Sequence, residues 1–408
     1  MPTTIALAET RWMGHHPTFF REFTASLRRL GMFVIALCPR PEELEEADGM
    51  FAARLDAPYS GLVTPLENDP ASTFARWWIT RRVLDRAEET CGRRADIVFF
   101  PYLDNYLRFL PFGLVPDVVL GRRWSGLYFR NQHLGGSGRS PGAWLRDMAK
   151  GDRILRSRQA LPWIGVLDER FDEALVRRLG RQALAFPDIT DETTPAPRSS
   201  RVDDLRARAK GRPIVGLAGS LEKRKGLLTM LRTAEASAAA GDKWYFAALG
   251  TFTDATFTTD ERAWIEQTRH RLADSLFLDM TRTRIPDGAE YNAVVACFTV
   301  AWAAYESFHG SSNTLTKAAL FRRPVLASEG ECIGDRVVAH ALGATFPERD
   351  HVAARAALAR LIDEEKEGGV ARGYDGYRRL HSRAQLDAVF QRLVASALPA
   401  ASQGSYPA

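Results

Sequence analysis

Polar side chains able to hold a phosphate group gather between two apolar runs in the last third of the chain. An acidic residue, Glu306, follows the apolar run 297–304, and a small polar turn at 311–313 precedes a second run at 324–328. Apolar runs of this length fit buried parallel strands, and the turn offers residues that cap a helix. Because a helix N-terminus presents free N–H groups and partial positive charge, this pattern predicts a phosphate site. The alternative for Glu306 is a cap on a neighbouring helix or a pair with Lys317.

A cluster of positive charge opens the second half of the chain. The strand-like run 213–220 leads into Lys223-Arg224-Lys225-Gly226, and an amphipathic helix is expected from Leu227. Positive charge at the N-terminus of a helix opposes the helix dipole, so the cluster favours a bound anion. Lys225 is the strongest candidate for the cationic group, and Arg224 stands beside it. The alternative is a solvated basic helix start.

Polar residues also follow three predicted strands in the first half of the chain, at 4–8, 95–100 and 126–130. Binding and catalytic groups of open α/β sheets lie beyond the carboxyl ends of their strands. The candidates in these positions are Gly14, His15, His16, Asp104, Arg130 and His133. The alternative for the two adjacent histidines is that they only orient the following helix, and the aspartate would then be a helix N-cap.

The order of the predicted elements indicates two α/β domains. Strand, helix, strand is the usual opening of a doubly wound, Rossmann-like sheet, and it occurs at the start of each half. The segment 190–200 is polar and contains two prolines, which is typical of a linker. We therefore expect an N-terminal domain over 1–195, a C-terminal domain over 196–382, a last helix over 383–398 and a disordered tail over 399–408.

The basic cluster resembles the phosphate-binding segment of GT-B glycosyltransferases, in particular the large family 4. Gly219, Leu221, Lys225 and Gly226 keep the spacing of that segment, and Ser220 stands where the family usually has arginine. The first cluster is similar to the same family in its acidic residue, polar turn, helix and following basic-Pro-Val strand.

The same resemblance aligns the end of that helix with the family pattern. The basic-Pro-Val strand begins here as Arg323-Pro324-Val325. Counting back from Pro324, Lys317 occupies the place of a second glutamate that usually binds the ribose. Ser220 and Lys317 thus depart from the pattern, and Lys317 follows Glu306 by eleven residues rather than by the family's eight.

The resemblance implies two Rossmann-like domains that face a cleft, with the C-terminal helix crossing back to the N-terminal domain. It also implies transfer of a sugar, with retention of configuration, from a nucleoside-diphosphate sugar to a hydroxyl of a glycan, a lipid-linked or a small-molecule acceptor. No metal or other cofactor is expected, because no DxD motif stands at a strand end in the second half. Without a metal, cationic side chains must neutralise the leaving diphosphate.

The resemblance assigns a role to each candidate residue. The residues expected to act on the sugar or the acceptor hydroxyl are Glu306, His15, His16 and His133. The residues expected to bind the donor are Gly219, Ser220, Arg224, Lys225, Ser311, Ser312, Asn313 and Lys317. The residues expected on the acceptor side are Gly14, Asp104 and Arg130.

The composition is typical of a soluble globular protein. The 408 residues are 45% hydrophobic and 26% charged, with a net charge of +5. The sequence has no apolar run long enough to cross a membrane and no N-terminal signal, and its four dispersed cysteines form no CxxC pair. We therefore expect a cytoplasmic protein. The charge is too evenly spread for a dedicated nucleic-acid binder.

One stretch, 118–158, combines nine basic residues with four aromatic ones. This combination suits peripheral contact with an anionic membrane or with a phosphate-bearing acceptor. The alternative is a solvated arginine-rich face.

Two other functions are compatible with this fold, since a fold does not determine chemistry. One is a catalytically silent subunit that binds a nucleotide and supports a partner, which the departures at Ser220 and Lys317 would explain. The other is an epimerase or hydrolase of nucleotide sugars.

Overall fold

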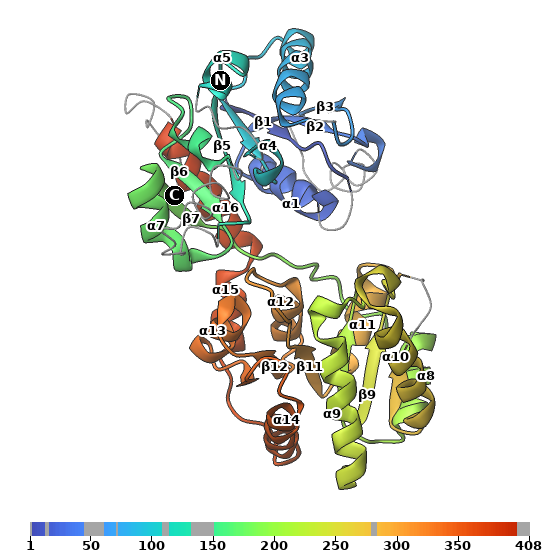
Figure 1. Cartoon of the computed structure of the whole chain (residues 1–408). Helices are drawn as coiled ribbons and strands as arrows, with labels where there is room; N and C mark the ends of the chain where they lie inside the picture. The colour runs from blue at the N-terminus through green and yellow to red at the C-terminus, as the bar shows by residue number, and fades with distance from the viewer. Residues whose placement is uncertain are drawn as a thin grey trace. The chain divides into compact units, whose positions relative to one another are not determined.

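The chain forms two compact α/β units in a computed structural model (Figure 1). The first comprises Met1–Pro187 and Ser382–Ala408, and the second comprises Asp188–His381. The structure describes residues 2–12, 16–44, 61–70, 72–107, 114–131, 151–278 and 284–397. Among these residues, no helix is both long and apolar enough to cross a bilayer.

The first unit is built on a parallel sheet of seven strands in the order β3-β2-β1-β4-β5-β6-β7. The chain adds strands in one direction from β1 and then in the other from β4, so the topological switch point lies between these two strands. All residues of β1 and β4 are buried, as expected for apolar strands covered on both faces. The strands are β1 Thr4–Ala8, β2 Phe33–Cys38, β3 Leu62–Pro65, β4 Ile97–Phe100, β5 Arg123–Tyr128, β6 Trp163–Val166 and β7 Gln182–Ala185.

Capping residues mark some helix ends of the first unit. Helix α3, for example, starts after Ser72, whose hydroxyl accepts the Ala75 N–H, and stops at Gly92 in the left-handed conformation with φ of 63°. The helices are α1 His16–Arg29, α3 Thr73–Cys91, α4 Asp104–Leu107, α5 Val115–Val119, α7 Asp172–Leu179 and α16 Arg383–Ala397.

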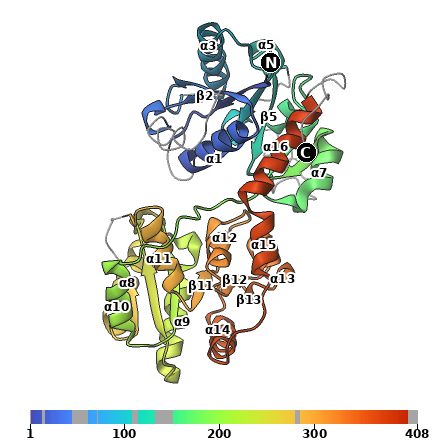
Figure 2. The same ribbon diagram turned by 180° about the vertical axis from the view of Figure 1, so that it is seen from behind.

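The last helix, α16, packs on the first unit, as the resemblance implies. Its Phe390 meets the rings of Phe23, Phe99 and Phe186 with centroids 5.2–5.3 Å apart. Asp387 accepts hydrogen bonds from Arg29 at 2.8 and 3.1 Å, which joins α16 to α1. Figure 2 shows the two helices crossing on the same side of the sheet. The predicted return of the C-terminal helix is therefore confirmed.

The second unit has a parallel sheet of six strands in the order β10-β9-β8-β11-β12-β13. Its switch point lies between β8 and β11. The strands are β8 Ile214–Ala218, β9 Tyr245–Leu249, β10 Leu276–Leu278, β11 Val300–Ala303, β12 Val325–Ser328 and β13 Gly343–Phe346. The helices are α8 Ser200–Ala209, α9 Leu227–Ala240, α10 Thr259–Arg271, α11 Ala289–Cys297, α12 Asn313–Leu320, α13 Glu331–Ala339, α14 His351–Lys366 and α15 Tyr374–Leu380.

Alternation along β8 shows how helices cover both faces of this sheet. Val215 and Leu217 join the core under α9, α10 and α14, whereas Ile214 and Ala218 join the core under α8 and α11. Because successive side chains of a strand point to opposite faces, one apolar strand serves two cores. This is the doubly wound architecture that the order of elements predicts.

The boundary between the units lies at Pro187, earlier than the boundary that linker composition predicts at 195. The segment after Pro187 is already bonded to the second unit: Asn313 donates to the Ile189 carbonyl at 2.6 Å, and Lys317 donates to the Asp191 carbonyl at 2.7 Å. Composition identifies a polar segment, but it does not show which side chains of the second unit form hydrogen bonds with that segment. The predicted tail over 399–408 lies outside the described residues.

The first and last residues of the second unit, Asp188 and His381, are bonded to each other. The backbone N–H of Asp188 donates to Nδ1 of His381 at 2.9 Å. Burial, together with the positive charge of Arg336 and His340, lowers the pKa of His381 from 6.5 to about 3. Between these values the unfolded chain binds a proton here that the folded chain does not, so acid favours unfolding.

When the pH falls from about 7 to about 5, the unfolding free energy of the wild-type protein should decrease. We expect this decrease to be about 2 kcal/mol larger than in the His381→Asn variant. Asparagine keeps an acceptor for Asp188 but does not titrate. Urea unfolding at a series of pH values measures the difference. A difference between the two proteins that is constant with pH would contradict this account of His381.

Candidate functional site

The predicted donor segments meet at the switch point of the second unit. One follows β8 and carries Gly219 and Lys225, and the other follows β11 and carries Glu306. Gly226 brings them together, because a Cβ added to it would lie 2.0 Å from the carbonyl oxygen of Ala304. Its φ of +73° is also left-handed, which favours glycine. The Lys-Gly pair thus lets the start of α9 touch the end of β11.

Among the described residues, Lys225 is the cation of this turn that has no direct ion pair. Its ammonium lies 5.7 Å from the centre of the Tyr305 ring, and a Cβ on Gly219 would be 3.1 Å from it. Within the described residues it has no hydrogen bond or ion pair, whereas Lys223 pairs with Glu261 and Arg224 with Glu222. Lys225 is therefore the cation in this turn that can bind an anionic ligand without first breaking an ion pair within the protein.

Ser220 and Arg224, the residues at and near the family's arginine position, are both engaged with Glu222. The Ser220 hydroxyl donates to one carboxylate oxygen, and Arg224 donates to the other at 2.6 Å. Burial would raise the pKa of Glu222, but Ser220, Arg224 and the nearby charge of Lys225 together outweigh burial and lower it. Arg224 would have to leave this carboxylate to reach a ligand.

Glu306 is 5% exposed, and both of its carboxylate oxygens are bonded. Thr229, in the first turn of α9, donates to Oε1 at 2.6 Å, and Arg349 donates to Oε2 at 3.0 Å. The backbone N–H of Glu306 donates to the Arg224 carbonyl at 2.8 Å. The carboxylate is therefore fixed in place, and its partner is Arg349 rather than Lys317.

The loop that supplies Arg349 closes over the residue after Glu306. Arg349 donates to the Ser307 hydroxyl at 3.1 Å, and the Ser307 N–H donates to the Glu348 carboxylate at 2.8 Å. Ser307 and Arg349 both have left-handed φ angles, 49° and 68°. Left-handed residues other than glycine are uncommon and cluster at functional sites. Sequence patterns missed Arg349 and Thr229, because each lies far along the chain from Glu306.

The polar turn after Glu306 starts α12, as predicted. Ser312 is the N-cap: its hydroxyl accepts the Thr314 N–H at 3.2 Å and donates to the Tyr305 hydroxyl at 2.9 Å. Burial would raise the pKa of Tyr305, but Lys225 and the hydroxyls of Ser312 and Thr314 outweigh it and lower that pKa. The Tyr305 side chain therefore contacts both the Ser312 cap and the Lys225 ammonium.

Ser311 and Asn313, on either side of this cap, bond to the chain segment that enters the second unit. Ser311 donates to Asp188 at 2.5 Å and accepts from Arg336 at 2.7 Å. Asn313 accepts from Thr190 at 3.0 Å. Their side chains therefore hold the protein's own chain here, and a role in donor binding stays a prediction.

Lys317, at the expected ribose position, is 4% exposed. Its ammonium donates to the Asp191 carbonyl and to the Asn292 side-chain oxygen, both at 2.7 Å. Burial lowers the pKa of Lys317 to about 8, although the charges of Asp191 and Asp287 oppose this. At the position where the family pattern has a ribose-binding glutamate, this chain therefore has a lysine that is hydrogen-bonded within the protein.

A second polar group lies at the switch point of the first unit. His16 Nδ1 is 3.1 Å from a carboxylate oxygen of the buried Glu9, which follows β1. The His16 ring stacks on Tyr102 at 4.2 Å, and Tyr102 stacks on Phe129 at 4.1 Å. Sequence analysis found His16 but not Glu9 or the aromatic stack.

Asp104 joins this group at the end of β4. Its carboxylate accepts the backbone N–H groups of Phe129 at 2.8 Å and Arg130 at 2.9 Å. Burial raises the pKa of Asp104 to about 6, although these N–H groups and the Arg130 charge oppose it. Asp104 is also the first residue of α4, the helix that it was alternatively expected to cap. Gly14, His15 and His133 lie outside the described residues.

No family model matches the sequence, and no curated protein is significantly similar to it. Solved structures do match over nearly the whole chain. Sucrose-phosphate synthase of Thermosynechococcus elongatus has a TM-score of 0.64 at 17% identity, covering 97% of this chain and 100% of that one. HepE of Anabaena, in complex with UDP and glucose, has a TM-score of 0.62 at 13% identity with coverage of 97% and 100%. The UDP-forming trehalose-phosphate synthase of Burkholderia vietnamiensis has a TM-score of 0.60 at 15% identity, with coverage of 96% and 100%.

The chain has the GT-B fold. The first unit is its N-terminal Rossmann-like domain, the second is its C-terminal one, and α16 returns to the first. The predicted fold class is confirmed. In this GT-B chain, each of the two polar groups lies at the switch point of one sheet, the position at which open α/β sheets bind ligands.

Proposed function

We propose that this GT-B protein transfers a glycosyl group from a nucleoside-diphosphate sugar to an acceptor hydroxyl. The observation that carries the proposal is Lys225, a cation at the switch point of the second unit that has no hydrogen bond or direct ion pair among the described residues. Support comes from the similar HepE structures, whose bound ligands are UDP, UDP and glucose, and UDP-glucose.

In the proposed reaction, the bond between the anomeric carbon and the diphosphate oxygen breaks while the acceptor oxygen bonds to that carbon. The diphosphate gains the bonding electron pair, and the acceptor hydroxyl gives up its proton. Lys225 and the N–H groups at the start of α12 stabilise the charge that builds on the leaving group. Water-poor surroundings strengthen such contacts.

Glu306 has the geometry of a fixed acceptor for a sugar hydroxyl. An ionised carboxylate offers about four lone-pair positions, and side chains occupy two in this structure, from Thr229 and Arg349. We propose that a hydroxyl group of the donor sugar donates to one of the remaining positions. The two bonds also hold the carboxylate in one orientation, which is what positioning a substrate requires.

We assign the acceptor to the switch point of the first unit. His16 lies 3.1 Å from the Glu9 carboxylate, and Asp104 is held by two backbone N–H groups. A histidine and a carboxyl group with a pKa near 6 are suitable for exchanging a proton with a hydroxyl. The acceptor is a glycan, a lipid-linked or a small molecule.

Further features follow the resemblance to family 4. We propose membership of that family, retention of configuration and transfer without a metal, with the nucleotide sugar as the only co-substrate. A reducing cytoplasm is proposed from the four free cysteines.

A catalytically silent subunit is the second candidate. It is favoured by Lys317, whose internal bonds replace the expected ribose contact, and by Ser311 and Asn313, which bind the protein's own chain. A silent subunit would bind a nucleotide without consuming a nucleotide sugar. An epimerase would consume the sugar nucleotide without needing an acceptor.

The test is a thermal-shift screen of nucleoside diphosphates and their sugars, followed by product analysis with and without acceptors. We expect one nucleoside diphosphate to raise the melting temperature, with a stabilisation of about 2.7 kcal/mol at one hundred times its Kd. Sugar transfer to an acceptor would support the transferase. Binding without turnover would select the silent subunit, turnover without an acceptor would select the epimerase or hydrolase, and no binding of any nucleotide would overturn the proposal.

A further inference from the structure

Helix α3 presents an exposed stripe of two aromatic and two basic residues. Phe74, Trp78, Arg82 and Arg86 follow one another at four-residue spacing, so they wind along one side of the helix. Phe74 is 54% exposed and Trp78 is 52% exposed. Among the described residues they are the large aromatic side chains with the highest exposure. We call these four residues the α3 stripe.

The neighbouring helix α5, with the residue that caps its N-terminus, adds two aliphatic side chains. Leu114 is 66% exposed and Val118 is 81% exposed, again at four-residue spacing. Both views of the chain place α5 beside α3 (Figures 1 and 2), and Arg81 of α3 donates to the Leu120 carbonyl at the end of α5. Single exposed apolar residues are ordinary, but paired ones on two adjacent helices indicate a binding surface.

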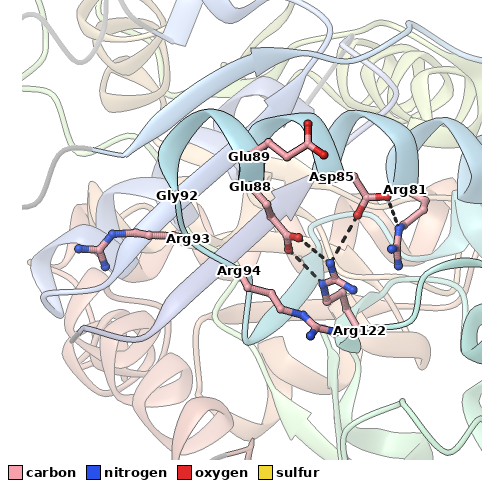
Figure 3. A pocket seen from close by; sticks show the side chains of 8 residues that line it. All are labelled: Arg81, Asp85, Glu88, Glu89, Gly92, Arg93, Arg94 and Arg122. Carbon is pink, nitrogen blue, oxygen red and sulfur yellow. Dashed lines mark hydrogen bonds and ion pairs between the residues drawn. The ribbon is translucent and has the colours of Figure 1, made fainter.

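Two of the three acidic side chains of α3 are neutralised within the protein, and the third, Glu89, is exposed. At the C-terminal end of α3, Arg122 binds Glu88 and Asp85, and Asp85 also binds Arg81 (Figure 3). These residues line an open hollow of about 500 Å³. The side chains of Arg82 and Arg86 are exposed and have no hydrogen bond or ion pair in the described part of the chain.

We propose that the α3 stripe, with Leu114 and Val118, binds the surface of an anionic lipid bilayer. Tryptophan and phenylalanine insert favourably at the boundary of headgroups and acyl chains, and arginine binds lipid phosphate. The stripe offers both along one helix that can lie flat on a membrane. The unpaired arginines favour an anionic bilayer over an apolar protein surface, because burying them against apolar groups would leave their charges unsatisfied.

Apart from Val118, this surface lies outside the stretch 118–158 that composition suggested. Within that stretch, residues 132–150 lie outside the described residues, Arg122 is paired with Glu88, and Arg156 donates to the Arg178 carbonyl. The stripe does not depend on the proposed glycosyl transfer, and it would place the N-terminal domain at a membrane whatever the acceptor.

The experiment is co-sedimentation of the full chain with vesicles of phosphatidylcholine, alone or mixed with phosphatidylglycerol. We expect binding to the mixed vesicles that weakens with salt. Phe74→Gln combined with Trp78→Gln should weaken it roughly tenfold. Arg82→Gln combined with Arg86→Gln should weaken it about fivefold for each arginine. Val352→Gln is the matched control, because Val352 is 66% exposed on a helix of the other unit.

The proposal is overturned if the wild-type chain does not bind mixed vesicles, if it binds neutral vesicles equally well, or if the control weakens binding as much as the stripe variants. The main competing occupant of this surface is a second copy of the chain, and sedimentation velocity without lipid tests for it. Dissociation of an oligomer by the aromatic substitutions would identify a second copy of the chain as the partner and overturn the membrane assignment. Unchanged melting temperatures show that the variants fold.

Discussion

Lys225→Ala is expected to weaken binding of a nucleoside diphosphate about a hundredfold, whereas Lys223→Ala leaves it within about twofold. Both lysines lie in one three-residue turn before α9. Lys223 is paired with Glu261, while Lys225 has no direct ion pair among the described residues and lies beside the Gly219 backbone. A charged hydrogen bond to phosphate contributes about 1.5–3 kcal/mol, which is the size of the expected effect.

Isothermal titration with uridine diphosphate measures this pair of variants at one salt concentration. The matched comparison removes one positive charge in each case, so a general electrostatic attraction would weaken both equally. Lys225→Arg should recover part of the affinity, since it keeps the charge but changes its geometry. Equal losses for the two alanine variants, or no loss at Lys225, would remove this lysine from the donor site.

The sequence was sufficient for the architecture because most strands of the two sheets are short apolar runs followed by a polar turn. The edge strands β3 and β13 were not predicted, because they are only partly buried and lack such a run. The start of α12 was predictable for the same local reason, since Ser312 caps it from within three residues. The spacing from Gly219 to Gly226 was also readable, and the structure supplies its cause: Gly226 touches the Ala304 carbonyl.

The parts that could not be predicted depend on contacts between distant segments. Arg349 reaches Glu306 from the loop after β13, and nothing local to Arg349 marks it. Lys317 looks like a surface residue of an amphipathic helix, yet it is buried against the Asp191 carbonyl. The same contact moves the start of the second unit to Asp188, ahead of the polar segment that composition identifies.

Glu306→Gln is expected to lower kcat/KM for sugar transfer about a hundredfold while changing the affinity for uridine diphosphate less than about twofold. The separation follows from where the carboxylate acts: uridine diphosphate lacks the sugar that Glu306 would hold. The amide keeps the shape of the side chain. Its oxygen can accept from Arg349, and its NH₂ group can donate to the Thr229 hydroxyl, so the loss of unfolding free energy should stay near 1 kcal/mol.

The neighbouring Glu348→Gln is the control for the carboxylate itself. Glu348 also lies near Arg349, at 3.5 Å, and accepts the Ser307 N–H, but it does not bond to α9. If Glu306 only braces α9 against β11, its substitution will lower the melting temperature and the nucleotide affinity together and leave no separate loss of transfer. A large loss of kcat/KM with intact nucleotide binding requires a carboxylate that meets the sugar, because neither Thr229 nor Arg349 needs a negative charge to keep the fold. Both outcomes are measurable on the same preparations, so the experiment distinguishes a substrate contact from a structural brace.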